Sequence, residues 1–199
     1  MADPINDLAL HTLFRRARSY NSWKEEAVPE VMMHAIYDLA KWGPTSANAS
    51  PARFIFLPAG SSGRDKLKPL LSESNVEKTM TAPWTVIIAH DLDFHEKLPE
   101  LFPHDQTAKD WFADPDHRET NAVRNGSLQS AYFLMAARAL GLDCGPMSGF
   151  DIKGVDEAFM TGDRERWRTN WICNLGHGDP KGVFDRSPRL DFDQACVIL

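Results

Sequence analysis

The order of helices and strands that the sequence predicts is typical of an α+β fold. Helices are predicted where apolar residues recur every three to four positions, and strands where short apolar runs are rich in β-branched residues. The chain gives the order helix, helix, strand, helix, strand, helix, strand. This order contains few short crossovers between strands, so it favours an α+β fold over a doubly wound sheet.

Two helices and a strand are expected in the first 60 residues. Residues 6–19 form an amphipathic pattern, with apolar side chains at Leu10, Leu13, Phe14 and Ala17. A second helix is expected to begin at Pro29, which suits a first helical turn, and to end at Gly43-Pro44. Its expected buried stripe is Met32, Ile36, Leu39 and Ala40. After a polar loop, residues 53–57 are predicted to form a strand.

The middle of the chain combines a buried strand with an aromatic stretch. Residues 62–71 are predicted to form a helix. Residues 84–89 are apolar and β-branched, so a strand buried on both faces is expected. Residues 91–116 are broken by prolines but rich in aromatic side chains, so these rings are expected to cover something.

The last third is predicted to hold the longest helix and the final strand. The helix covers residues 119–140, and Gly141 follows it where a left-handed C-cap is favoured. Gly145-Pro146 predicts a tight turn, residues 155–160 a short helix and residues 169–175 a strand. The sequence contains no linker or internal repeat, so residues 1–199 are expected to form one domain.

Composition excludes several classes of function. The formal net charge of -6 and the pI of about 5.6 argue against nucleic-acid binding. No apolar run reaches the ~20 residues that span a bilayer, and the first ten residues do not resemble a signal peptide. Cys144, Cys173 and Cys196 lack C-x-x-C spacing, so buried, reduced thiols in a cytoplasmic protein are expected.

No self-contained catalytic motif is present in the sequence. The seven histidines are scattered without paired ligand spacing, so no metal site is expected. Neither the phosphate loop G-x-x-x-x-G-K-[ST] nor the nucleophile elbow G-x-S-x-G occurs. If the protein is an enzyme, a cofactor is therefore expected to carry the reaction.

Four segments carry a family resemblance in order along the chain. They are Ala-Arg-Ser-Tyr-Asn at 17–21, Pro-Thr-Ser-Ala-Asn-Ala-Ser-Pro at 44–51, Asn-Val-Glu-Lys at 75–78 and Gly-Pro-Met-Ser-Gly-Phe at 145–150. In this order and spacing the chain resembles the nitroreductase family of FMN enzymes. The resemblance implies a nitroreductase-like fold, in which helices flank a central, mostly antiparallel sheet, and an intertwined homodimer.

The resemblance also implies which residues bind the flavin. Arg18, Ser19 and the late Arg186 match positions that hold the phosphate, whose charge favours arginine and hydroxyl donors. Asn75 and Lys78 match positions at the isoalloxazine edge. The complete implied set is Arg18, Ser19, Asn21, Thr45, Ser46, Asn48, Asn75, Lys78, Pro146, Met147, Ser148, Gly149 and Arg186.

Part of this implied site crosses the dimer interface. Thr45, Ser46 and Asn48 lie in the loop that in the family reaches the flavin of the partner subunit. Gly149 matches a position whose N–H approaches the reactive ring nitrogen, and glycine permits that approach. The aromatic stretch around Phe102, Trp111 and Phe112 would then cover the substrate face, with ordinary core packing as the alternative.

Several of these residues also have a simpler interpretation. Arg18 alone would be a solvated charge at a helix end, and Lys78 an exposed side chain on a short helix. The loop at 45–51 alone would be a connection whose hydroxyls cap their own backbone. Gly149 alone would be a turn glycine.

Departures from the family pattern narrow the implied activity. Ser148 stands where the family usually has glutamate, Asn21 where many members have a basic residue, and Ala52 where tryptophan is usual. These changes argue against nitroaromatic specificity. They fit a branch that reduces malonic semialdehyde to 3-hydroxypropanoate in pyrimidine degradation, which residues 41–48, 101–104 and 141–150 also resemble.

The implied reaction is a two-step hydride relay. NADPH or NADH would reduce FMN, and a small-molecule substrate would then receive the hydride from the same ring face. Arg53 or Arg124 could neutralise a substrate carboxylate. Two alternatives are a broad-specificity NAD(P)H nitro/quinone reductase and a non-catalytic flavin-binding protein.

Overall fold

Four antiparallel strands form the centre of the protein. The structure, a computed structural model, describes residues 3–199. In sheet order the strands are β1 (Ala52–Pro58), β2 (Trp84–Asp91), β4 (Trp167–Gly176) and β3 (Asp143–Met147), and each neighbouring pair runs antiparallel. The α+β class and the antiparallel sheet expected from the sequence are therefore confirmed.

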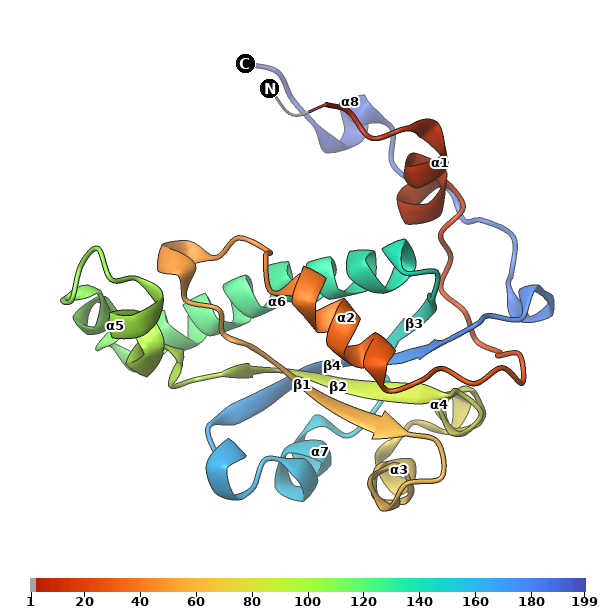
Figure 1. The fold of residues 1–199 in the computed structure, drawn as a ribbon, viewed down its shortest axis with the longest axis horizontal. Coiled ribbons are helices and arrows are strands. Elements are labelled where there is room, and N and C mark those ends of the chain that lie inside the picture. The colour runs from red at the N-terminus through yellow and green to blue at the C-terminus, as the bar shows by residue number, and fades with distance from the viewer. Residues whose placement is uncertain (1–2) are drawn as a thin grey trace.

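Helices cover both faces of this sheet (Figure 1). One face carries α2 (Val31–Ala40) and α6 (Pro115–Ala139), and the other carries α3 (Ser62–Leu67), α4 (Glu73–Met80) and α7 (Ile152–Phe159). Strand β2 is buried on both sides because its alternate residues enter different cores. Val86 and Ile88 pack in the core with α2 and α6, whereas Ile87 packs in the core with α3 and α7.

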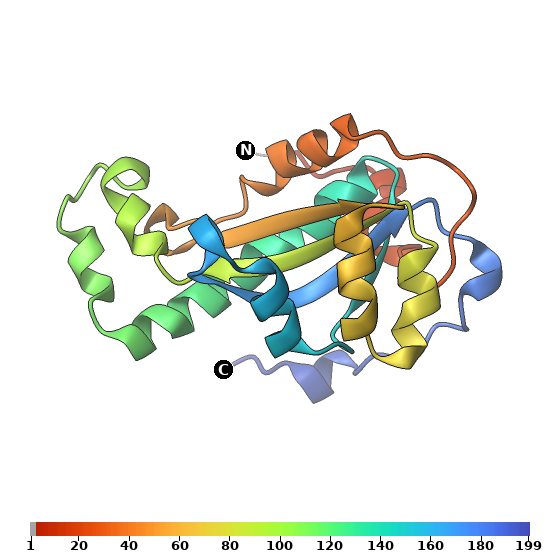
Figure 2. The same cartoon turned by 90° about the horizontal axis from the view of Figure 1, so that it is seen from below.

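A third apolar cluster extends the fold beyond one end of the sheet (Figure 2). It is built from two 3₁₀ segments, Phe94–Lys97 and Ala108–Phe112, and the short helix α5 (Leu98–Leu101). Phe112 is buried there and meets Phe94 edge-to-face, with ring centroids 4.9 Å apart. Trp111 is half exposed. Phe112 therefore packs as ordinary core, and Trp111 stays available at the surface.

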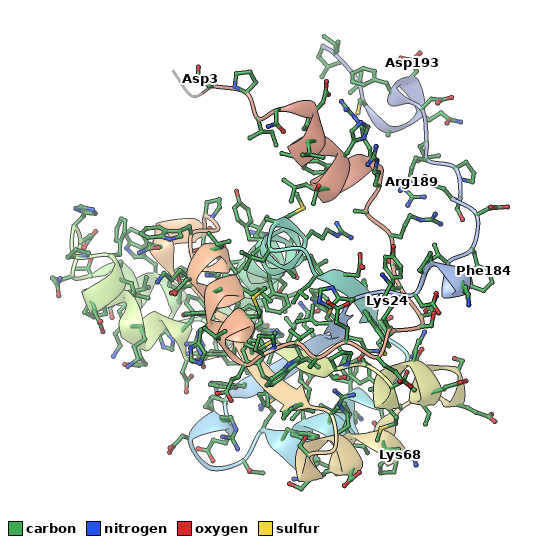
Figure 3. All side chains as sticks on the ribbon, turned by 45° about the vertical axis from the view of Figure 1, so that its right-hand side comes forward. Asp3, Lys24, Lys68, Phe184, Arg189 and Asp193 are labelled. Carbon is green, nitrogen blue, oxygen red and sulfur yellow. The ribbon has the colours of Figure 1, made fainter. Side chains whose placement is uncertain are left out.

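The two ends of the chain stand away from the sheet and its helices (Figure 3). The N-terminal segment holds α1 (Asp7–Leu10), which continues as a π-helical turn over His11–Arg15, and the C-terminal segment holds α8 (Phe192–Ala195). Both segments project on the side of α2 and α6 (Figure 1). Their exposed apolar side chains include Ile5, Leu8, Phe14, Phe184, Leu190, Phe192, Val197, Ile198 and Leu199.

Two predictions about local structure are wrong. Gly145 and Pro146 do not form a tight turn, because both lie in β3, where Pro146 stands opposite Cys173 of β4. β3 is an edge strand, and one side of an edge strand needs no ladder donor, so it tolerates proline. Leu39 was expected to face the core but is 46% exposed, because α2 buries Met33, Ile36 and Ala40.

Helix boundaries also differ from the sequence expectation. The N-terminal helix, expected to residue 19, ends at Arg15, and the helix expected over 62–71 gives way to a 3₁₀ turn after Leu67. α6 begins at Pro115, earlier than residue 119, because the Asp114 carboxylate caps it by accepting from the His117 N–H at 2.8 Å. Gly141 adopts the left-handed conformation expected after this helix, with φ +84°.

Across residues 3–199, no helix is both long and apolar enough for a bilayer crossing. The same residues contain no group of three or more His, Cys, Asp or Glu side chains suited to a metal ion. Cys144 and Cys173 are buried free thiols, as expected, but Cys196 is exposed.

Candidate functional site

Two adjoining cavities bring together chain segments that are far apart in sequence. The arginine cavity, about 330 Å³, lies between residues 17–21, residues 183–189 and Arg138 of α6. The lysine cavity, about 600 Å³, lies between residues 21–23, α4 and residues 182–184. Asn21 and Phe184 line both cavities. The two therefore form neighbouring parts of one depression.

Hydrogen bonds hold the two walls of the arginine cavity together. Arg18 donates to the carbonyl oxygen of Phe184. Arg186 donates in the opposite direction, to the carbonyl oxygens of Arg15 and Ala17, each at 2.9 Å. Ser19 forms a parallel β-bridge to Cys144, which anchors its segment to the edge of the sheet. The segments that were expected to bind one phosphate thus lie side by side.

The arginine cavity carries an excess of positive charge. Arg18, Arg138, Arg186 and Arg189 line it, and Asp185 is its one acidic lining residue. Within residues 3–199, none of these four arginines takes part in a salt bridge. Figure 3 shows Arg189 extending from the C-terminal segment. A phosphate monoester carries about two negative charges, so its chemistry matches this lining.

The lysine cavity presents a partly desolvated cation. Lys78 Nζ donates to Asn21 Oδ1 at 3.3 Å. Its carbonyl oxygen accepts from Trp23 Nε1 at 2.8 Å and from Asn174 Nδ2 at 3.1 Å, so the end of α4 is fixed from two sides. Burial lowers the pKa of Lys78. An anionic neighbour in this cavity would offset that desolvation.

Asn75 joins α4 to the turn that follows β3. Its side-chain Nδ2 donates to the carbonyl oxygen of Gly149 at 2.7 Å, and that oxygen also accepts from the Ser72 N–H at 3.1 Å. A Cβ at position 149 would lie 2.6 Å from Asn75 Nδ2. The close approach therefore requires glycine.

The rest of this motif lies against α4 rather than on the cavity walls. Pro146 and Met147 are strand residues, and Met147 Sδ accepts from Thr79 Oγ1 at 3.5 Å. The carbonyl oxygen of Ser148 accepts from the Phe150 N–H at 3.1 Å. Among the described residues that line the two cavities, 146–149 are absent.

The loop at 45–50 lies at the opposite end of the sheet in the same chain (Figure 2). Thr45 Oγ1 accepts from the Ser50 N–H at 3.1 Å. The Ser46 N–H donates to Asn125 Oδ1 at 2.8 Å, and Asn48 Nδ2 donates to the Leu101 carbonyl at 2.9 Å. One chain therefore does not bring Thr45, Ser46 and Asn48 to the cavities that hold the other predicted site residues.

This loop also has an unusual backbone. Ala47, Asn48 and Ser50 have φ values of +49°, +51° and +44°. Left-handed conformation costs a non-glycine residue roughly 1–2 kcal/mol. Such strain persists only where the surroundings hold it, and it is concentrated at functional sites. α6 holds both ends of the loop, because Gln129 Oε1 accepts from the Ala52 N–H at 2.9 Å and Asn125 holds Ser46.

A third cavity, about 380 Å³, lies beside β1 and α2. Met33, Tyr37, Phe56 and Trp84 dominate its lining, which contains neither arginine nor lysine. It therefore offers an apolar surface but no counter-charge for a phosphate.

Comparison with known proteins gives the family. Residues 14–177 match the family model described as the nitroreductase family. This chain belongs to the nitroreductase family. A Xanthomonas oryzae pv. oryzae protein, named for an inferred NADH dehydrogenase/NAD(P)H nitroreductase activity, is 55% identical over 197 residues and covers 98% of each chain.

Solved nitroreductase-type structures share the fold. A protein of Exiguobacterium sibiricum, crystallised in complex with FMN, superposes with a TM-score of 0.84 at 18% identity over 100% of both chains. A Staphylococcus epidermidis protein, described as an NAD(P)H:FMN oxidoreductase, gives a TM-score of 0.83 at 20% identity, with 100% of this chain and 98% of that chain covered. At these identities the likeness establishes the nitroreductase fold.

Three residues of the two cavities were not singled out by the sequence. Trp23 supports Lys78, Phe184 lines both cavities, and Arg138 lines the arginine cavity. A basic residue in the last turn of a helix, such as Arg138, is also common where only the helix dipole favours it. Its sequence context alone therefore does not distinguish a ligand from a surface charge.

Proposed function

We propose that this protein is an FMN-dependent NAD(P)H oxidoreductase. The observation that carries the proposal is the pairing of two adjoining cavities. One is rich in arginines that form no salt bridge among residues 3–199, and the other holds the partly buried Lys78. The first suits a phosphate and the second an electron-accepting ring. Family membership supports it, as do the FMN complex of the structural neighbour and the NAD(P)H-dependent activity in the relative's name.

The chain's own side chains would divide the work of binding. Arg18, Ser19 and Arg186 would hold the phosphate, and Asn21 and Lys78 would lie at the ring. Asn75 would keep the turn at Ser148 and Gly149 against α4, with Pro146 and Met147 fixing the strand before it. Bound FMN would supply hydride transfer between NADH or NADPH and a second substrate.

A homodimer would complete this site. Leu39, Trp42, Leu128 and Tyr132, here called the α2–α6 face, are exposed apolar residues on or beside these two helices. Trp42 is 77% exposed, and its neighbour Gly43 lies against the Tyr132 ring. Exposed apolar surface of this kind is typical of an interface. The apolar terminal segments project on the same side, which supports an intertwined pair (Figure 1).

The separation of the two site halves also supports the dimer. The arginine and lysine cavities lie at one end of the sheet, and the strained loop at 45–50 lies at the other (Figure 2). A two-fold axis through the α2–α6 face would place the loop of one subunit near the cavities of its partner. Thr45, Ser46 and Asn48 would then contact the partner's flavin.

The proposed substrate is malonic semialdehyde, reduced to 3-hydroxypropanoate in pyrimidine degradation in the cytoplasm. Two of the segments that carry this resemblance, 41–48 and 101–104, are joined by the hydrogen bond from Asn48 to Leu101. Arg53 is already paired with Asp91 at 2.7 Å, so the exposed Arg124 on α6 is the better candidate to neutralise the substrate carboxylate. The second candidate, a broad nitro/quinone reductase, is favoured by the name of the 55% identical relative.

Anaerobic spectroscopy of the purified protein tests the cofactor and the turnover. We expect a yellow protein whose FMN absorbance bleaches when NADH or NADPH is added. A colourless protein that does not take up added FMN would contradict the proposal. Bound FMN that does not bleach with either nucleotide would indicate a flavin-binding protein without turnover.

Steady-state rates then separate the two substrate candidates. Under the proposal, kcat/KM for malonic semialdehyde exceeds the values for a nitrofuran and a quinone. Arg124→Gln should raise KM for the semialdehyde and leave quinone reduction unchanged. If only the nitrofuran and the quinone turn over, the broad reductase is the correct assignment.

A further inference from the structure

We infer that Arg138 binds the flavin phosphate directly and sets the preference of the site for FMN over riboflavin. This inference rests on the proposed function, because it concerns the same cofactor. No motif of the sequence marks Arg138 as part of the site, and the geometry alone brings it there.

The Arg138 guanidinium has donors that are not used elsewhere. Its Nε is buried and has no hydrogen-bond partner among residues 3–199. Its one hydrogen bond there is long, from NH1 to the Leu13 carbonyl at 3.4 Å. A buried donor without a partner is costly, so an anion that draws the guanidinium toward the cavity would offset that cost.

The place of Arg138 in the fold is beside a space that suits an anion. Arg138 lines the arginine cavity together with Arg18, Ser19 and Arg186. It also lines a neighbouring cavity of about 240 Å³ with Tyr20 and Asp143, so it stands between the two spaces. Asp143 is already engaged, because its Oδ2 accepts from the Gly178 N–H at 2.9 Å. No salt bridge neutralises Arg138 within the described chain.

Arg138 is the one arginine of the cavity that a long helix supports. The other three arginines, Arg18, Arg186 and Arg189, come from irregular segments. The NH1 group of Arg189 donates to the nearby carbonyl oxygens of Ser187 and Pro188. A ligand on a rigid element loses less conformational freedom on binding. Arg138 is therefore held by a regular element, whereas the positions of the other three depend on contacts between irregular segments.

Charge counting supports a role for this additional arginine. Four arginines against one aspartate leave three uncompensated positive charges in the lining of the cavity. The phosphate of FMN brings about two negative charges, and riboflavin brings none. The arrangement therefore favours the phosphorylated flavin specifically. Removal of Arg138 should weaken the binding of FMN and leave the binding of riboflavin unchanged.

Titration of flavin-stripped protein with FMN and with riboflavin tests the inference. For Arg138→Gln we expect the Kd for FMN to rise about 10- to 100-fold, which is typical when a charge-assisted hydrogen bond is lost, with the Kd for riboflavin nearly unchanged. Arg138→Lys keeps the charge but lacks the planar set of donors of the guanidinium, so it should recover part of the affinity. The matched control is Arg164→Gln, because Arg164 is exposed and lies outside both cavities.

The outcomes separate this inference from the proposed function. If Arg138→Gln weakens FMN and riboflavin equally, Arg138 supports the fold and does not bind phosphate. If it changes neither Kd, Arg138 does not contact the flavin, although the protein remains a flavoenzyme. A parent protein that binds neither flavin would overturn both proposals. Riboflavin binding also reports whether the variant is folded.

Discussion

At the scale of single residues, His90 is a polar side chain that is buried inside the sheet. It is 5% exposed, and neither ring nitrogen has a hydrogen-bond partner among residues 3–199. Burial lowers its pKa, against the opposing effect of nearby carboxylates. The charged groups that face it are Glu119, Asp156, Arg168 and Asp91.

We predict that His90 makes the protein less stable in mild acid. Its pKa is lower in the folded chain than the ordinary value near 6.5, so the unfolded chain binds more protons below that pH. Stability should therefore fall as the pH drops below about 6.5, by at most ~1.4 kcal/mol per pH unit from this group. In His90→Gln, chemical denaturation should show a smaller loss between pH 7 and pH 5.

The exposed His104 provides the control for this measurement. His104→Gln should follow the parent protein across the same pH range. An identical acid dependence in the parent and in His90→Gln would exclude His90 as its cause. His95 has a lowered pKa through burial as well, so the His90 variant should retain part of the effect.

At the scale of elements, helix α6 acts as the support of the strained loop at 45–50. Three left-handed, non-glycine residues would not hold their conformation alone. Two amides of α6, Asn125 and Gln129, accept hydrogen bonds from the backbone at either end of the loop. Asn125 in turn donates to the Asn121 carbonyl at 2.9 Å, so its amide is oriented within the helix.

We predict that Asn125→Leu destabilises the protein by about 1–3 kcal/mol. The substitution leaves the part-buried Ser46 N–H without its acceptor, and losing a hydrogen bond whose acceptor residue, Asn125, is 2% exposed costs about that much. Thermal or urea unfolding would measure the change. Asn170→Ala, which removes an exposed hydrogen bond to Ser127, should cost less than about 0.5 kcal/mol. Equal losses in the two variants would mean that Asn125 does not hold the loop.

The elements that the sequence predicted well are those with a clear apolar pattern. Residues 84–89 lie within β2, whose side chains are almost all buried. Most of the stretch at 119–140 lies in α6, which ends at Ala139 and whose second half buries Phe133, Ala136 and Ala137. α4 was not among the predicted elements, although a short helix at Lys78 was considered, because it buries Asn75 and Thr79 instead of an apolar stripe. β3 was missed because Gly145-Pro146 has turn composition, and only the position of the strand at the sheet edge makes proline acceptable.

Only those parts of the site that carry sequence motifs could be predicted. The Arg18 segment and the Arg186 segment do lie together, as the family resemblance implied. Arg138 could not be predicted, since its place in the cavity depends on how α6 packs behind residues 13–19. The distance between the loop at 45–50 and the cavities could not be predicted either, because it depends on the sheet that separates them.

At the scale of the whole molecule, exposed apolar residues favour the proposed homodimer. The α2–α6 face and the terminal segments expose large apolar side chains that a partner would cover. The same contact would bring together the two halves of the site. Assembly and cofactor retention are therefore expected to depend on one another.

We predict that Trp42→Glu weakens both the dimer and FMN binding. A carboxylate on the α2–α6 face would be desolvated without a partner in the proposed dimer, so the dimer dissociation constant should rise at least about tenfold. Sedimentation at several concentrations, recorded at the flavin absorbance, measures both effects. Ile152→Glu is the control, because Ile152 is an equally apolar, exposed residue on α7 across the sheet. A flavin-loaded Trp42→Glu monomer would contradict the shared site.

The opposite placement of the cavities and the loop at 45–50 has a genetic consequence. A chain substituted only at Arg18 would keep an intact loop at 45–50. A chain substituted only at Asn48 would keep an intact arginine cavity. In the proposed dimer, one of the two sites of such a pair would carry both defects and the other would carry none. Two inactive alleles expressed in the same cell should therefore complement each other, as they would not if each subunit built its site alone.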